Sequence, residues 1–182
     1  MGDVAMTVPV LSAFSNSYPD IKLTVLTKKQ FAPLFRDLDS VSVLLADFKK
    51  DHKGVFGLYQ LSKLVRNLQI DTVADLHNVL RTKILKLFLS GVKVAQIDKG
   101  RSEKKALVSG RISEALRSTP QRYADVFRGL GFGFEIDPPF FLAPQPLDPT
   151  TTKILGDFSK ATVGIAPFAA YASKTYPLSQ ME

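Results

Sequence analysis

The chain has 182 residues, of which 45% are hydrophobic and 23% charged, and its net charge is +7. This is the composition of an ordinary globular chain, with one domain or one domain and part of another. The lack of cysteine excludes disulfides and thiolate chemistry, and no apolar run reaches the roughly eighteen residues of a membrane span. The positive charge favours anionic partners such as phosphates, nucleic acid or an acidic membrane face, but it is also typical of a solvated surface.

The elements alternate in type along the chain. Residues 2–9 predict a strand-to-helix loop, and Val10, Ala13 and Phe14 form the apolar stripe of the helix that follows. Runs of β-forming residues predict strands at 21–27, 41–48, 72–76 and 92–97. Apolar residues at helical spacing predict three further helices, at 58–68, 80–88 and 123–130, the last of which Gly131 closes. The stripe of the second consists of Leu80, Ile84, Leu87 and Phe88.

This alternation predicts an α/β fold, a Rossmann-like parallel sheet covered by helices on both faces. In such folds a strand precedes the first loop, and we expect that this first strand is missing from the chain. Five prolines between 138 and 149 predict a stiff connector. Beyond it we expect a helix at 150–158, a strand at 161–166 and a loop through Lys174, which are too few residues to enclose a core. They therefore predict the start of a second, truncated domain.

Asp3 is the first candidate for chemistry. A carboxylate at the carboxyl edge of a parallel sheet can accept a proton from a substrate hydroxyl. The same position suits an aspartate that caps a helix, so the sequence leaves both interpretations open.

A second candidate is the turn after the predicted strand at 72–76. His77 and Arg81 are four residues apart and could face one ligand from the same side of a helix. The alternative is that Asn78 caps this helix and Arg81 is solvated. We expect no metal site, because His52 is the only other histidine and lies in a charged loop.

Three other segments are polar or rich in small residues. The basic loop at 98–105, with Lys99 and Arg101, could bind anions or be a solvated run of charge. Residues 119–123, with Arg122, favour a capped helix start. At 166–177 an apolar strand leads into a loop with Ser173 and Lys174, a plausible cradle for diphosphate that matches neither a Walker loop nor a GxGxxG motif.

Taken in order, these segments resemble glycosyltransferase family 9, the ADP-heptose:lipopolysaccharide heptosyltransferases. The matching segments run along the whole chain: Gly2-Asp3-Val4 with Thr7, Asp75-Leu76-His77 with Arg81, Asp98-Lys99-Gly100-Arg101, Gln121-Arg122-Tyr123, and residues 163–177. The family has a GT-B architecture, in which two Rossmann-like domains face each other across a cleft. The resemblance implies the amino-terminal half of such an enzyme and the start of its second domain.

The resemblance also implies which part of the chain binds each substrate. Residues 1–142 would be the acceptor-side domain without its first strand, residues 143–149 a linker, and residues 150–182 the start of the donor domain. The enzyme would transfer heptose from ADP-heptose to the anionic inner core of lipopolysaccharide, a lipid A–Kdo acceptor, with inversion. Asp3 matches the general base, and Lys174 with Ser173 matches the donor-diphosphate site. The implied acceptor-binding residues are His77, Arg81, Lys99, Arg101 and Arg122.

The same resemblance implies no cofactor and no metal, a cytoplasmic enzyme in peripheral contact with the inner membrane, and no nucleic-acid partner. We expect the 182-residue chain to be inactive by itself, because the later donor-domain motifs are missing from it. The alternative is a nucleotide- or nucleic-acid-binding α/β module without glycosyl transfer. That alternative accounts for the charge and the strand–helix alternation but not for the ordered segments on both sides of the connector.

Overall fold

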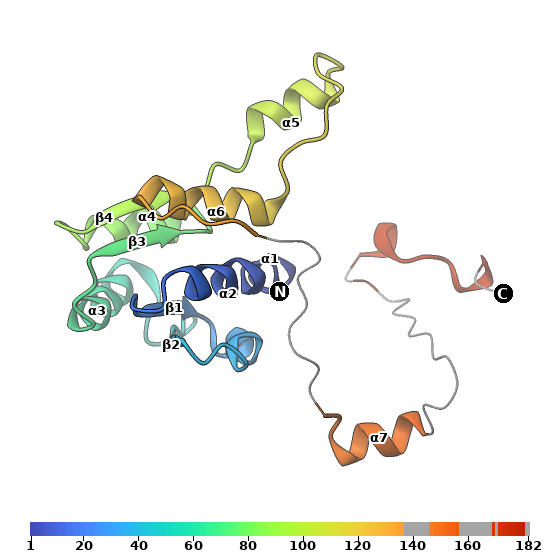
Figure 1. Ribbon diagram of the computed structural model, residues 1–182, viewed down its shortest axis with the longest axis horizontal. Coiled ribbons are helices and arrows are strands. Elements are labelled where there is room, and N and C mark those ends of the chain that lie inside the picture. Colours follow the sequence, from blue (N-terminus) through green and yellow to red (C-terminus); the bar gives the residue numbers. More distant parts are fainter. Residues whose placement is uncertain (137–145, 157–168, 170, 181–182) are drawn as a thin grey trace. The chain divides into compact units, whose positions relative to one another are not determined.

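The structure is a computed structural model that describes residues 1–136, 146–156, 169 and 171–180 (Figure 1). The chain divides into two compact units, Met1–Leu142 and Ala143–Glu182, and each is described by itself. The first unit contains the strands and the helices that cover them.

The strands of the first unit form two parallel pairs. Strand β1 (Leu23–Thr27) pairs with β2 (Val41–Leu45), and β3 (Thr72–Asp75) pairs with β4 (Lys93–Gln96). All four strands lie where the sequence predicts them, and each is shorter than predicted. Their β-branched and aliphatic residues suit the pleated, partly buried surface of a sheet.

Side chains alternate between two hydrophobic clusters, as the twofold period of a strand requires. Val25 of β1 and Ala74 of β3 pack in one cluster, whereas their neighbours Leu26 and Val73 pack in the other. Because both strand pairs contribute to both clusters, the pairs form one layer between two layers of helices. The predicted Rossmann-like α/β arrangement is therefore confirmed.

Helices α2 (Val8–Ser17) and α6 (Thr119–Leu130) supply the first cluster, and α3 (Gly54–Asn67) and α4 (Leu80–Leu87) supply the second. Phe14 of α2 and Phe127 of α6 meet with their ring centroids 4.7 Å apart. Helix α6 begins with a capping box, in which the Ser118 hydroxyl and the Gln121 side chain each accept a hydrogen bond from the other residue's backbone N–H. It ends at Gly131, whose φ of 103° is left-handed, so both predicted ends of this helix are confirmed.

Three predictions about local structure are wrong. Residues 2–5 form a single helical turn, α1 (Gly2–Ala5), rather than a loop, and the second half of the basic loop is helix α5 (Arg101–Val108). Of the apolar stripe predicted for α4, Ile84 and Phe88 pack against the second cluster, but Leu80 and Leu87 are 74% and 78% exposed and Leu85 is buried instead. The face of this short helix that carries Leu85 packs toward α3, whereas Leu80 and Leu87 are its first and last residues. A 3₁₀ helix, η1 (Lys29–Phe35), was also not predicted.

The second unit contains α7 (Pro149–Leu155) and two 3₁₀ turns, η2 (Ala172–Lys174) and η3 (Leu178–Gln180). Asp148 caps α7 by accepting hydrogen bonds of 3.0 Å from the backbone N–H groups of Thr150 and Thr151. The helix predicted at 150–158 is thus found through Leu155. The strand predicted at 161–166 lies outside the described residues.

Candidate functional site

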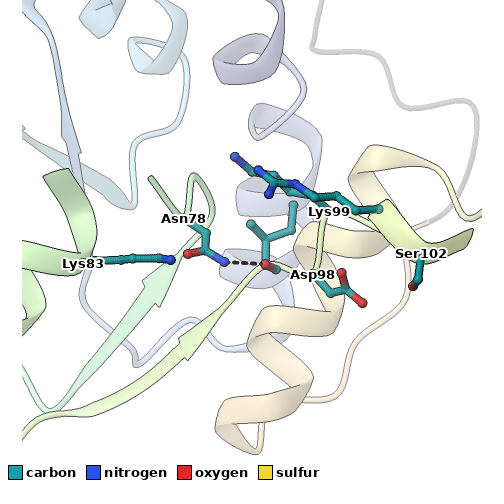
Figure 2. Close-up of a pocket in the computed structure, with 7 residues that line it drawn as sticks. Asn78, Lys83, Asp98, Lys99 and Ser102 are labelled. Atoms are coloured by element: carbon teal, nitrogen blue, oxygen red, sulfur yellow. Dashed lines mark hydrogen bonds between the residues drawn. The ribbon is translucent and has the colours of Figure 1, made fainter. Parts of the chain in front are cut away.

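The loops after β3 and β4 line a surface pocket of about 380 Å³ (Figure 2). These two strands are parallel neighbours, so both loops leave the same edge of the sheet, where ligands bind in open α/β folds. The lining is mostly polar and carries three basic side chains and one acidic one: Asn78, Lys83, Ile97, Asp98, Lys99, Arg101 and Ser102. Such a lining fits an anionic ligand.

Asp75, the last residue of β3, shapes the first of these loops. Its buried carboxylate accepts a 2.6 Å hydrogen bond from Lys86 Nζ, and its Oδ1 accepts two more from the backbone N–H groups of His77 and Asn78. Burial by itself raises the pKa of Asp75, but the hydrogen bond from Lys86 and those from Asn78 and His77 outweigh it and hold this pKa below its usual range. Asp75 therefore stays ionised and fixes the turn that carries His77 and Asn78.

Asn78 connects the two loops. Its Nδ2 donates a 3.1 Å hydrogen bond to the carbonyl of Ile97, and Figure 2 shows this bond across the pocket wall. The backbone of Asn78 is left-handed, with φ of 43°, a conformation that asparagine tolerates better than most residues. The N-cap of α4 is Val79, whose backbone N–H donates to the Thr82 hydroxyl at 3.0 Å, so the interpretation of Asn78 as the cap is wrong.

His77 and Arg81 are both exposed and lie outside the lining of the pocket. The Arg81 guanidinium lies over the Phe48 ring, 4.1 Å from its centroid, and so joins α4 to the loop after β2. The structure does not bring His77 and Arg81 together with the cations of the pocket.

Lys99 and Arg101 of the basic segment line the pocket. Gly100 between them adopts a left-handed conformation with φ of 59°, and its N–H donates to the Asp98 carboxylate at 2.8 Å. Lys83 is a third cation of the pocket, which the sequence analysis missed. Its position in the first turn of the helix after β3 is the signal that could have identified it.

Arg122 has a different environment from the other predicted acceptor residues. Its side chain is only 7% exposed and forms an ion pair with Glu103 of α5. It also donates to the backbone carbonyls of Arg117 at 3.3 Å and Asp98 at 3.5 Å. Arg122 thus supports the wall of the pocket from behind, and its guanidinium is already occupied by these partners.

Asp3 lies in α1 with an exposed side chain. Its backbone carbonyl accepts a 3.1 Å hydrogen bond from the hydroxyl of Tyr123, which fixes α1 to α6. Burial, and after it the negative charge of Asp3, raises the pKa of Tyr123. The N-cap of α1 is Met1, and Asp3 provides no side-chain cap, which leaves its carboxylate open to solvent.

Ser173 and Lys174 belong to η2 in the second unit, and both are exposed. Lys174 Nζ lies 5.7 Å from the centroid of the Tyr171 ring, and the Thr175 hydroxyl accepts a 3.3 Å hydrogen bond from the N–H of Ala169. The turn therefore presents a lysine and a serine to solvent.

Two negative findings hold for the described residues. No group of three or more His, Cys, Asp and Glu side chains there is arranged to hold a metal ion. No helix in this part of the chain combines the length and the apolar character that crossing a membrane requires.

The layered fold, with a pocket at the strand ends, defines a Rossmann-like α/β protein. The sequence matches no protein-family model. It is similar to lipopolysaccharide heptosyltransferase 3 of Escherichia coli, with 27% identity over 99 residues, which are 52% of this chain and 29% of that protein. The resemblance to the heptosyltransferases of glycosyltransferase family 9 is thereby confirmed.

The fold has a counterpart among solved structures. A glycosyl transferase family 9 protein of Veillonella parvula DSM 2008 aligns with 99% of this chain at a TM-score of 0.72 and 16% identity. The alignment covers 54% of that protein, so the chain spans about half the length of this structural relative and less than a third of the curated one. At this level of identity the likeness shows the fold.

Proposed function

We propose that this chain is part of an inverting glycosyltransferase of family 9, which transfers heptose from ADP-heptose to the inner core of lipopolysaccharide. The observation that carries the proposal is the exposed carboxylate of Asp3, at the position that matches the family's general base. The similarity to a heptosyltransferase supports the class of reaction.

In the proposed reaction Asp3 accepts the proton of an acceptor hydroxyl while that oxygen attacks the anomeric carbon of the heptose. The bond between this carbon and the diphosphate oxygen breaks on the opposite face, so the configuration inverts and ADP leaves. Lys174, with Ser173 beside it, compensates the negative charge that develops on the diphosphate. Their exposure in η2 is consistent with a ligand-binding turn.

The acceptor is anionic, and the first unit offers cations for it at the strand ends. Lys99 and Arg101 in the pocket, joined by Lys83, would bind phosphate or carboxylate groups of the lipid A–Kdo acceptor. His77 and Arg81, exposed on the neighbouring loop and helix, would extend this surface. Arg122 would act indirectly, through the position of Asp98 and Gly100.

In this proposal residues 1–142 are the acceptor side, residues 143–149 the linker and residues 150–182 the start of the donor side. The enzyme works in the cytoplasm in peripheral contact with the inner membrane, where its lipid acceptor lies. Because the chain spans only part of its relatives, we expect no turnover from the 182 residues alone.

The test is Asp3→Asn in the full-length enzyme. Asparagine keeps the size of aspartate but cannot accept the proton, so kcat should fall by at least about a hundredfold while melting and ADP-heptose binding stay nearly unchanged. Asp20→Asn, an exposed aspartate in the turn after α2, is the matched control and should keep full activity.

An active Asp3→Asn enzyme would remove Asp3 from the role of base. If the wild-type protein bound single-stranded nucleic acid and transferred no sugar, the alternative of a nucleotide- or nucleic-acid-binding module would replace the proposal.

A further inference from the structure

Helix α5 and the turn after it carry an apolar tip. In Figure 1, α5 projects away from the strands and from the helices that cover them, and none of its residues is buried. Val108 at its end is 90% exposed, and Leu107 and Ile112 are 38% and 36% exposed. Three aliphatic side chains at the end of a projecting helix thus present apolar surface to solvent.

Basic side chains surround this tip. Residues 99–117, here called the α5 segment, hold six basic and only two acidic residues, so four of the chain's seven net positive charges are concentrated in it. The basic residues are all exposed or partly exposed: Lys99, Arg101, Lys104, Lys105, Arg111 and Arg117. Clusters of this size bind anionic lipid headgroups.

The base of the α5 segment is held firmly against α6. Glu103 forms the ion pair with the buried Arg122, and Gly100 packs so closely on that guanidinium that a Cβ atom there would lie 2.4 Å from Arg122 Nη2. The tip is therefore a projection with a fixed base.

We propose that the α5 segment docks the protein on an anionic lipid bilayer, with Leu107, Val108 and Ile112 entering the boundary between headgroups and acyl chains. The basic residues around them would contact the headgroups, the pattern of interfacial segments that bind by apolar burial and charge together. A bilayer fits better than nucleic acid, because the α5 segment contains no aromatic residue on which bases could stack. The inference deepens the membrane contact of the proposed function, but it depends on no sugar transfer.

The test measures binding of the 182-residue chain to sedimenting vesicles. We expect binding to vesicles of equal parts phosphatidylglycerol and phosphatidylcholine, and little binding to phosphatidylcholine alone. Val108→Asp should weaken it roughly tenfold, since a fully buried valine contributes about that factor. Replacing Lys104 and Lys105 by serine should cost about fivefold per charge and flatten the salt dependence.

Leu87→Asp is the matched control, because Leu87 is 78% exposed at the end of α4 and lies outside the α5 segment. It should bind vesicles as the wild type does. Equal vesicle binding by Val108→Asp and wild type would overturn the proposal. So would preference for a single-stranded oligonucleotide over anionic vesicles.

A second readout separates this inference from the proposed function. With a deacylated, water-soluble acceptor, the full-length Val108→Asp enzyme should transfer sugar at the wild-type rate. If no sugar is transferred by any variant but Val108→Asp still loses vesicle binding, the proposed function fails and the membrane-docking role of the α5 segment stands.

Discussion

The carboxylate of Asp75 determines the shape of the loop at the end of β3. It is 97% buried and accepts the Lys86 ammonium and two backbone N–H groups. Asp75→Asn removes the charge that makes these hydrogen bonds strong, so we expect the free energy of unfolding to fall by about 2 kcal/mol in urea denaturation. Asp37→Asn, which removes one partner of an exposed ion pair with Arg36, should cost less than about 0.5 kcal/mol. Equal losses in the two variants would contradict this role of Asp75.

Asp75 should also make the free energy of unfolding depend on pH. The pKa of Asp75 is lower in the folded chain than in the unfolded one, so below its unfolded pKa the unfolded state binds more protons. Its stabilising contribution is therefore complete at neutral pH and is lost as the pH falls below about 4 and through the folded pKa. In Asp75→Asn this part of the acid destabilisation should be absent when unfolding is measured as a function of pH.

At this scale the sequence offered candidate site residues but could not predict what surrounds each of them. Lys99 and Arg101 do line the pocket, because they follow β4 directly. Arg122 has the same charge and could not be distinguished by sequence, yet it is buried against Glu103 from a distant segment. Whether a cation is free or paired depends on tertiary contacts that residue type and spacing do not encode.

At the scale of elements, α5 shows what periodicity cannot predict. The helices α2, α3 and α6 have apolar faces that bury against strands, and their spacing predicted them. Helix α5 buries no residue, so no apolar period marks it, and its charged residues were interpreted as a loop. The helix depends instead on contacts at its base, through Gly100 and Arg122.

Substituting two glycines that share a backbone conformation tests whether α5 depends on the contacts at its base. Gly100 and Gly110 both have positive φ, of 59° and 70°, but a Cβ at Gly110 meets nothing within 4 Å. Gly110→Ala should cost only the left-handed strain, about 1–2 kcal/mol. Gly100→Ala should cost measurably more, because Arg122 must also move from its ion pair with Glu103. Thermal unfolding compares the two, and equal losses would show that the contact with Arg122 contributes nothing.

At the scale of the whole first unit, the two strand pairs are joined by side chains and not by backbone hydrogen bonds. Both pairs contribute to the same two clusters, but among the described residues no hydrogen bond joins β1 to β3. The sequence predicted the parallel strands from their composition. In a Rossmann-like sheet a central strand lies between two such pairs.

If a strand can lie between β1 and β3, adding one should stabilise the first unit. A parallel strand there would form backbone hydrogen bonds with both neighbours, β1 and β3. We expect that an amino-terminal extension with an apolar strand of about six residues, followed by a short turn, raises the melting temperature by at least about 4 °C. In a domain of this size that shift corresponds to about 1–2 kcal/mol. Amide exchange in Leu23–Thr27 and Thr72–Asp75 should slow at the same time.

The control is an extension of equal length made of glycine and serine, which cannot supply the apolar contacts on either face of the layer. It should leave both melting and amide exchange unchanged. If the apolar extension also melts at the original temperature, the two strand pairs do not accept a strand between them. The two strand pairs would then be joined through the two shared hydrophobic clusters, to which they contribute Val25, Leu26, Val73 and Ala74.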